Sequence, residues 1–363
     1  MALNMILTGD VNLMNVADPA VPFRRVGEEL RQADVVFGNL ECCLMIPHGH
    51  SVGNEGFFAD PIVGGEALRL GGIQAVGIAN NVHYGDANIL ASIARLDALG
   101  IPHAGAGKDL AAARAPVILE RGGLRFGFLQ RSSVYWPTNH EAHADAPGIA
   151  VIRGHTAYHV PMFKTHPGVP PPNRPGVPPE IVTWADKAYL RAFTDDVAAL
   201  RPRVDIVVAS LHWGLGKDVL QYMTEIAHAA IDAGADIVIG HGPHYSLPVG
   251  MHKGKAIFYG LGNLSFHTGH GGRQHGDWLG MLVRAAVGRN GIEEVGFRFV
   301  RHTEGNETFW SDLDKEAEEQ ADLAKRSVRF GARLLYEGSE VRVGSTGADC
   351  TSDALQHGPR SAT

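Results

Sequence analysis

The chain of 363 residues carries a formal net charge of -7 at pH 7, and 45% of its residues are hydrophobic. These values describe a globular protein with a sizeable core, and the acidic balance without a basic run argues against a nucleic-acid partner. No apolar stretch is long enough to span a bilayer, and the N-terminus enters a strand without a signal sequence. We therefore expect no membrane partner and a cytoplasmic location.

Strands and helices are predicted to alternate over the first 130 residues. The apolar runs at 5–8, 34–38 and 75–79 are continuous and rich in Val and Ile, which is typical of strands covered on both faces. Amphipathic stretches at 22–33 and 87–100 separate them and predict helices. This βαβ alternation indicates an α/β protein.

The middle of the chain is predicted to interrupt the sheet. A strand at 124–130 is followed by an irregular stretch from about 131 to 179, rich in His and Pro. So many prolines exclude a central helix or strand and favour an excursion over the surface. Helix and strand alternation then resumes from about 183 to 266.

The C-terminal part is predicted to hold two strands within 280–302, joined by a turn at Arg289-Asn290-Gly291. A charged helix is expected from about Ser311 to Leu335, and a flexible polar tail from 344 to 363. We therefore predict a single domain over residues 1–343 with an insertion at about 131–179.

Six short polar clusters each follow a predicted buried strand. Because the carboxyl ends of parallel strands meet at one edge of a sheet, we expect these clusters to converge. Carboxylate, amide and imidazole groups from separate loops can enclose one or two divalent ions, which activate water and polarise carbonyls. The clusters are GD at 9–10, NLE at 39–41, NN at 80–81, HWG at 212–214, HGPH at 241–244 and GN at 262–263.

Single residues of these clusters also have structural alternatives. Asp10 could cap a turn, Asn81 could supply a left-handed residue, and His212 could be a satisfied core histidine. The repetition of the pattern at six strand ends favours the metal site over these alternatives.

Together the motifs resemble those of the CapA-like family, which is associated with poly-γ-glutamate capsule synthesis. The resemblance covers about residues 4–300 and includes the stretch GIPHAGAGKDLAAARAPVIL at 100–119. It implies an α/β four-layer αββα sandwich, the calcineurin-like metallophosphatase fold, with one or two divalent ions; Mn, Ca, Mg, Zn and Fe remain open. The metal ligands that the resemblance implies are Asp10, Glu41, Asn81 or its neighbour Asn80, His212, His241 and His244.

The chain departs from the family after its third motif. Relatives commonly read NNH followed by Asp, whereas this chain reads Asn80-Asn81-Val82-His83 and then Asp86. The displaced histidine argues against phosphoester hydrolysis. The candidate acid and base groups are His83 or Asp86 on one side of a substrate, and on the other a histidine of the insertion between His140 and His159, such as His155, or of the cluster from His267 to His275, such as His267.

Three classes of function are considered for a chain with these residues. The preferred interpretation is metal-dependent epimerisation of an amino-acid α-carbon in a ribosomal, lasso-type precursor peptide, because some CapA-like relatives tailor such peptides. Inversion requires two proton-transfer groups and stabilisation of the enolate, which a metal beside His and Asp groups can provide. The alternative is a metal-dependent hydrolase or a protein of poly-γ-glutamate biosynthesis. A binding module with a purely structural metal is less favoured because no closed Cys/His shell is present.

Overall fold

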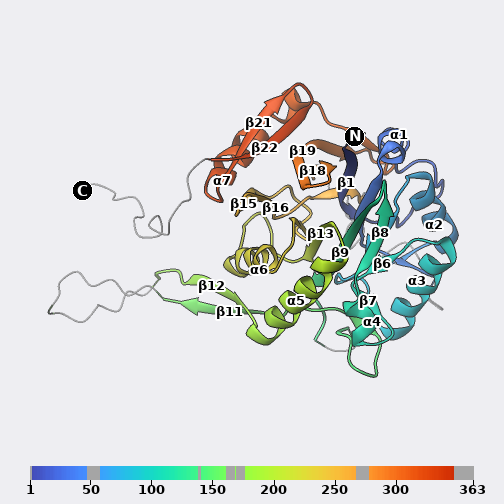
Figure 1. Ribbon diagram of the computed structural model, residues 1–363, viewed down its shortest axis with the longest axis horizontal. Helices are drawn as coiled ribbons and strands as arrows, with labels where there is room; N and C mark the ends of the chain where they lie inside the picture. Colours follow the sequence, from blue (N-terminus) through green and yellow to red (C-terminus); the bar gives the residue numbers. More distant parts are fainter. Residues whose placement is uncertain are drawn as a thin grey trace.

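The computed structural model describes residues 2–46, 58–137, 140–160, 168, 176–266 and 278–346. Two mixed β-sheets pack face to face, and helices cover the outer face of each (Figure 1). This is the α/β sandwich expected from the sequence. Within the described residues, the larger sheet has ten strands and the smaller one six.

The larger sheet is built around the N-terminal strand β1 (Leu3–Val11), which is parallel to β2 (Val35–Leu40) on one side and antiparallel to β18 (Gly280–Gly288) on the other. Beyond β2 lie two short parallel strands, and beyond β18 the sheet is antiparallel. The remaining strands are β5 (Ala75–Gly77), β6 (His103–Ala104), β17 (Asn263–Ser265), β19 (Gly291–His302), β20 (Thr308–Trp310), β21 (Ala332–Glu337) and β22 (Glu340–Ser345).

The smaller sheet has a parallel centre of β9 (Leu124–Ser132), β13 (Ile206–His212) and β14 (Ile237–His241). Its register places Ser132, His212 and His241 side by side at the carboxyl ends of their strands. The strand order is completed by β8 (Val117–Arg121), β15 (Val249–His252) and β16 (Lys255–Phe258).

Alternate side chains of the buried strands enter different apolar cores. Met5 and Leu7 lie in the core between the two sheets, whereas Ile6 faces the core beneath the helices of the larger sheet. Between the sheets, the rings of Phe37 and Phe128 stack with centroids 4.6 Å apart. Three such cores account for the four layers, since each sheet buries both of its faces.

The helices lie on both sides of the sandwich (Figure 1). The larger sheet is covered by α1 (Gly27–Gln32), α2 (Pro61–Leu70) and α3 (Asp86–Leu99), and the smaller by α5 (Lys187–Leu200) and α6 (Gln221–Asp232). Short elements complete the described chain: α4 (Leu110–Arg114), the 3-10 helices Arg201–Arg203 and Leu313–Glu316, and the strands β3 (Cys43–Leu44), β4 (Phe58–Ala59), β7 (Ala106–Gly107) and β10 (Gly148–Ile149).

The predicted insertion is more regular than expected. β11 (Gly154–His159) and β12 (Glu180–Ala185) pair as antiparallel strands and project from the body of the protein (Figure 1). The prediction of an irregular stretch was therefore wrong for β11. Its proline-rich part, at 167–179, lies mostly outside the described residues.

The C-terminal prediction is partly wrong. The hairpin of β18 and β19 is confirmed, with Gly288 paired to Gly291 across the predicted turn. The charged helix, however, is α7 (Ala317–Val328), and it ends before Gly331, which has a φ of 79°. A glycine in the left-handed region ends a helix readily, and the following residues form β21 and β22 instead. Strand β22 reaches Ser345, two residues into the predicted tail.

Candidate metal centre

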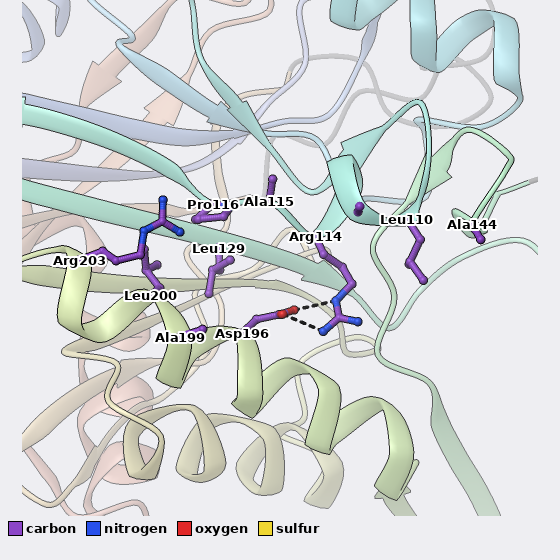
Figure 2. Close-up of a pocket in the computed structure, with 11 residues that line it drawn as sticks. Leu110, Arg114, Ala115, Pro116, Leu129, Ala144, Asp196, Ala199, Leu200 and Arg203 are labelled. Atoms are coloured by element: carbon purple, nitrogen blue, oxygen red, sulfur yellow. Dashed lines mark hydrogen bonds and ion pairs between the residues drawn. The ribbon is translucent and has the colours of Figure 1, made fainter.

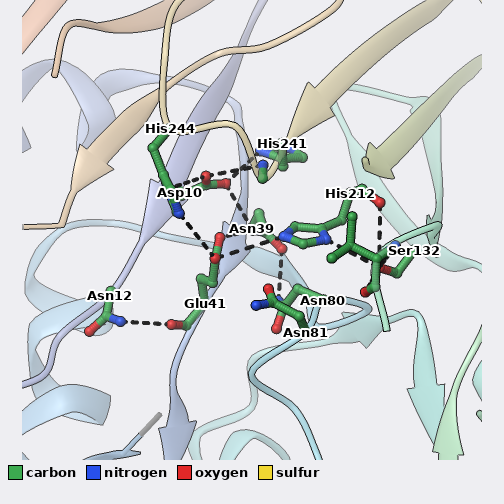
Figure 3. A network of polar contacts seen from close by, with 12 residues as sticks. Asp10, Asn12, Asn39, Glu41, Asn80, Asn81, Ser132, His212, His241 and His244 are labelled. Atoms are coloured by element: carbon green, nitrogen blue, oxygen red, sulfur yellow. Dashed lines mark hydrogen bonds and ion pairs between the residues drawn. The ribbon is translucent and has the colours of Figure 1, made fainter. Parts of the chain in front are cut away.

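The polar ends of strands from both sheets meet in one buried cluster (Figure 3). Asp10 of β1 pairs in register with Asn39 of β2, and Glu41 is the first residue after β2. From the other sheet, His212 of β13 pairs in register with His241 of β14. All five side chains are buried, with at most 2% of their surface exposed. The structure thus brings residues of four predicted clusters together.

The centre of the cluster is formed by two carboxylates and one imidazole. Asp10, Glu41 and His244 each offer a ligand atom, and these atoms all lie within 4.8 Å of one another. Oε1 of Glu41 is 3.8 Å from Nε2 of His212 and 3.8 Å from Nε2 of His244. Ligand atoms about 2.0–2.3 Å from one ion lie roughly 3–4 Å apart. The spacing and the mixed oxygen and nitrogen donors therefore fit a divalent cation.

Two imidazoles in the cluster have one nitrogen anchored and the other without a partner. Nδ1 of His241 is 3.0 Å from Oδ1 of Asp10, and Nδ1 of His212 is 3.1 Å from the Oγ of Ser132. Within the described part of the chain, Nε2 of both histidines is buried and has no hydrogen-bond partner. An imidazole held through one nitrogen with the other unused is the usual arrangement of a metal ligand.

The charges in the cluster are strongly interdependent. Burial, together with repulsion from Asp10, raises the pKa of Glu41 well above its ordinary value. Burial also acts to raise the pKa of Asp10, but hydrogen bonds from His241 and His244 outweigh it and hold that pKa far below its usual range. Burial opposes charging of His244, yet Glu41 and Asp10 raise its pKa to about 9. The positive charge of protonated His244 thus offsets the buried negative charge of Asp10. A bound divalent ion can supply this positive charge instead.

Tight backbone packing brings the ligands this close. A Cβ at Gly9 would lie 2.2 Å from the carbonyl oxygen of Gly262, so only glycine fits before Asp10. In the HGPH turn, Gly242 has a φ of 104° and His244 a φ of 64°. A left-handed histidine costs about 1–2 kcal/mol. This strained turn presents both His241 and His244 to the same cluster.

Of the two adjacent asparagines, Asn80 lies inside the network. Its Nδ2 donates to Oδ1 of Asn39 at 3.0 Å and to the carbonyl of Leu40 at 2.9 Å. Asn81 is half-buried, and its carbonyl accepts a hydrogen bond from the indole of Trp136 at 3.1 Å. The ligand role of Asn81 stays a prediction, while the structure gives Asn80 the buried position.

The two acid and base candidates of the third motif differ in placement. His83 is fully buried, its Nδ1 is 3.0 Å from Oδ1 of Asn80, and its Nε2 has no partner in the described residues. Burial lowers the pKa of His83 to about 3. Asp86 is exposed in the first turn of α3. Of this pair, the structure brings only His83 into the polar network.

The insertion contributes a different histidine from the one expected. His155 is exposed on β11, where its Nε2 is 3.2 Å from Asp186 and its ring stacks on Trp184. His140 is buried instead, with Nε2 3.0 Å from the carbonyl oxygen of Asn80. The structure therefore places His140 rather than His155 at the cluster. His267, the remaining candidate, lies outside the described residues.

Sequence reasoning missed several polar residues that support the cluster. Asn39 lies within the NLE motif, but the motif predicts a ligand role only for Glu41. Gln130 and Ser132 lie at the end of β9, which none of the six predicted clusters covers. Gln130 ends a buried apolar run, the same signal that marked the other clusters. The sequence does not assign Gln130 a role, because an amide in a strand is not by itself a metal-ligand signal.

A cleft of about 520 Å³ lies between α4 and α5 (Figure 2). Arg114 donates to Oδ1 of Asp196 at 2.7 Å, and the buried Arg131 donates to Oδ2 of the same carboxylate. These bonds tie α4, α5 and β9 together. The cleft is lined by none of the residues of the carboxylate and imidazole cluster.

Comparisons with known proteins agree with the motifs. The family described as bacterial capsule synthesis protein PGA_cap matches residues 4–268. A probable polyglutamine synthesis accessory protein of Mycobacterium tuberculosis (strain ATCC 25618 / H37Rv) is 31% identical over 210 residues, which cover 54% of this chain and 46% of that protein. The PGA biosynthesis protein CapA of Bacillus subtilis (strain 168) is 38% identical over 99 residues, covering 27% of this chain and 24% of that protein.

The chain is also similar to an uncharacterized protein of Sinorhizobium fredii (strain NBRC 101917 / NGR234). The two are 27% identical over 308 residues, which cover 72% of this chain and 66% of that protein. The chain thus spans about half the length of its M. tuberculosis relative. Among the described helices, none is long and apolar enough to cross a membrane. The family match, together with the two-sheet sandwich, shows that this chain belongs to the PGA_cap family of bacterial capsule synthesis proteins, which has the calcineurin-like metallophosphatase fold.

Proposed function

We propose that this protein is a metal-dependent enzyme that acts on amide bonds of a glutamyl polymer, as part of poly-γ-glutamate synthesis or processing. The observation that carries the proposal is the buried group of Asp10, Glu41 and His244, whose ligand atoms converge within 4.8 Å. Relatives named for PGA biosynthesis and polyglutamine synthesis suggest the substrate class.

A divalent ion held by Asp10, Glu41 and His244 would lower the pKa of a bound water and polarise an amide carbonyl. The chain's own residues prepare that chemistry. Ser132 orients the imidazole of His212 through Nδ1, and burial lowers the pKa of His212 to about 4. His212 is therefore neutral at neutral pH, which is the form of imidazole that binds a metal.

The test is incubation of the purified protein with γ-linked glutamate oligomers in water enriched in ¹⁸O. Hydrolysis places one ¹⁸O atom in each new carboxylate. With Mn²⁺ we therefore expect shorter oligomers that carry ¹⁸O, and with a chelator we expect the oligomers to keep their length and to carry no label. Asp10→Asn should be inactive. Asp232→Asn is the matched control, because Asp232 is partly exposed and contacts His252 and Lys253 rather than a candidate metal ligand. Oligomers that stay intact with the metal-loaded protein would contradict hydrolysis of this polymer.

A second candidate is epimerisation of an α-carbon in a precursor peptide, carried out in the cytoplasm where such peptides are made. It is supported by two buried imidazoles, His83 and His140, which both contact Asn80 and are not needed as metal ligands. Burial lowers the pKa of His140 to about 4, so both rings are neutral. Among the described residues, Nε2 of His83 has no partner and can accept a proton from a bound substrate. Both nitrogens of His140 are hydrogen-bonded, one to the backbone N–H of Trp136 and one to the carbonyl of Asn80, so His140 has to give up one of these bonds to take part.

Deuterated buffer separates the two candidates. Inversion adds one deuteron at the α-carbon without changing the chain length, whereas hydrolysis shortens the chain. If inversion takes place, His83→Ala and His140→Ala should each stop net inversion but differ in which substrate isomer exchanges its α-proton. Absence of exchange in both isomers with the wild-type protein would rule out this candidate for the peptide tested.

A further inference from the structure

Asn39 occupies the space between the two carboxylates of the cluster. Its Nδ2 lies 2.8 Å from Oδ1 of Asp10 and 3.0 Å from Oε2 of Glu41. An amide NH₂ group carries two hydrogens, and Asn39 donates one to each carboxylate. The side chain is fully buried, so these bonds do not compete with solvent.

A chain of amides determines the orientation of Asn39. The backbone N–H of Ala79 donates to Oε1 of Gln130 at 2.6 Å, which directs Nε2 of Gln130 toward Oδ1 of Asn39 at 3.0 Å. Asn80 donates to the same oxygen at 3.0 Å. A flipped Asn39 would set its oxygen against two carboxylates and its NH₂ against two donors. The amide therefore has one allowed orientation, in which both hydrogens and both oxygen lone pairs are used.

Glycines hold this arrangement in place. A Cβ at Gly38 would lie 2.3 Å from Oγ1 of Thr8, so β2 packs closely on β1 next to Asn39. A Cβ at Gly77 would lie 2.3 Å from Cδ of Gln130, so glycine makes room for the side chain that crosses from the smaller sheet to the larger one. Asn39 is thus fixed from both sheets.

The two hydrogen bonds from Asn39 use one oxygen of each carboxylate and leave the other oxygen facing His244. With Oδ1 of Asp10 and Oε2 of Glu41 held by Asn39, the other oxygens turn toward His244: Oδ2 of Asp10 lies 3.4 Å from its Nδ1, and Oε1 of Glu41 lies 3.8 Å from its Nε2. Oδ2 of Asp10 also accepts from the backbone N–H of Gly242 at 3.3 Å, but it and Oε1 of Glu41 are the carboxylate oxygens that Asn39 leaves available to a metal. The oxygen of Asn39 is used by Gln130 and Asn80 instead.

We propose that Asn39 is a positioning residue that orients the two carboxylates toward a bound divalent metal and takes no part in coordination. The inference rests on the metal centre of the proposed function and adds a residue that orients its ligands.

The test measures binding of Mn²⁺ by calorimetry, together with the ratio of metal to protein by elemental analysis. The wild-type protein should bind Mn²⁺. Asn39→Leu, which has a similar volume and no hydrogen-bonding groups, should weaken binding by about 10- to 100-fold, as is typical when a partner of a ligand is lost. Ser327→Ala is the control. The Oγ of Ser327 on α7 accepts a buried hydrogen bond from the backbone N–H of Val249 on β15, and loss of this bond should leave the affinity for Mn²⁺ unchanged.

Asn39→Asp provides a second variant of nearly identical shape if Asn39→Leu does not fold. It places a third carboxylate beside Asp10 and Glu41, so its Tm should fall without metal and rise more on addition of Mn²⁺ than that of the wild type. A purely structural Asn39 would lower both Tm values equally and leave Mn²⁺ affinity unchanged, which would overturn the proposal.

Because these readouts are binding and stability, the inference and the proposed function can fail separately. A wild-type protein that binds Mn²⁺ more tightly than its Asn39→Leu variant, but that processes no glutamyl polymer, supports the inference and contradicts the function. An active, metal-dependent protein whose Asn39→Leu variant binds Mn²⁺ normally supports the function and contradicts the inference.

Discussion

The carboxylate of Asp10 and the imidazole of His241 meet at 3.0 Å in a fully buried contact, although 231 residues separate them in the chain. Asp10 lies near the end of β1 in the larger sheet, and His241 ends β14 in the smaller one. The contact joins the two sheets at the edge where the candidate ligands converge. Changes at Asp10 therefore test the metal centre and the sheet contact together.

Asp10→Asn is expected to keep the fold and to lose metal binding. The amide retains the shape of the carboxylate and an oxygen that can accept from His241, but it lacks the negative charge that a cation requires. We expect the affinity for Mn²⁺ to fall by more than the roughly 100-fold typical of losing a hydrogen-bond partner of a ligand. Calorimetry measures this, with Asp232→Asn as the control. Wild-type affinity in Asp10→Asn would exclude Asp10 as a ligand.

Metal binding is expected to stabilise the protein. An ion that binds only the folded state, at 100 times its Kd, contributes about 2.7 kcal/mol to the free energy of unfolding. Thermal unfolding should therefore show a higher Tm with Mn²⁺ than with a chelator. Asp10→Asn should show no such difference. Equal Tm values for the wild type under both conditions would contradict a folded-state metal site.

Glu316 is expected to make the stability of the folded protein depend on pH. Burial acts to raise its pKa, but hydrogen bonds from Arg301 and Ser311 outweigh burial and lower that pKa below the ordinary 4.5. Arg301 reaches both carboxylate oxygens of Glu316, each at 2.6 Å. A lowered folded-state pKa adds stability that is present above about pH 4.5 and is lost as the pH falls through the lowered pKa.

The measurement is urea unfolding of the wild type and Glu316→Gln between pH 7 and pH 3. At pH 7 the variant should be less stable by about 1.5–3 kcal/mol, the usual contribution of hydrogen bonds to a charged group, and the difference should shrink toward pH 3. Glu340→Gln is the control, since Glu340 pairs with Arg284 at a more exposed position. A difference that stays constant with pH would show that Glu316 titrates normally in the folded protein.

Phe128→Ala is expected to open a cavity between the sheets. Phe128 is fully buried and stacks on Phe37 of the opposite sheet, and removal of a buried Phe side chain costs about 3–5 kcal/mol. Chemical unfolding would show this loss, while Phe128→Leu should lose less because it refills part of the space. A loss below about 1 kcal/mol would mean that the sheets close over the gap.

Several features of this protein were determined by the sequence alone. Continuous apolar runs identified β1, β2, β9, β13 and β14, because a strand buried on both faces has no polar alternation. The polar residues directly after those runs identified the edge of the sheets where Asp10, Glu41, His212 and His241 meet. The polar residues meet at one edge because parallel strands have their carboxyl ends at the same edge of a sheet.

The tertiary structure decided which of several similar residues enter the cluster. Asn80 and Asn81 are adjacent and chemically identical, yet Asn80 is buried because its amide bonds to Asn39 and Leu40 across the strand ends. His140 and His155 belong to the same histidine-rich stretch, but His155 lies on a projecting strand pair and His140 on a segment that packs against Asn80. These choices depend on packing between elements distant in sequence. Local patterns encode the strands and where they end, whereas the orientation of each side chain follows only when both sheets are assembled.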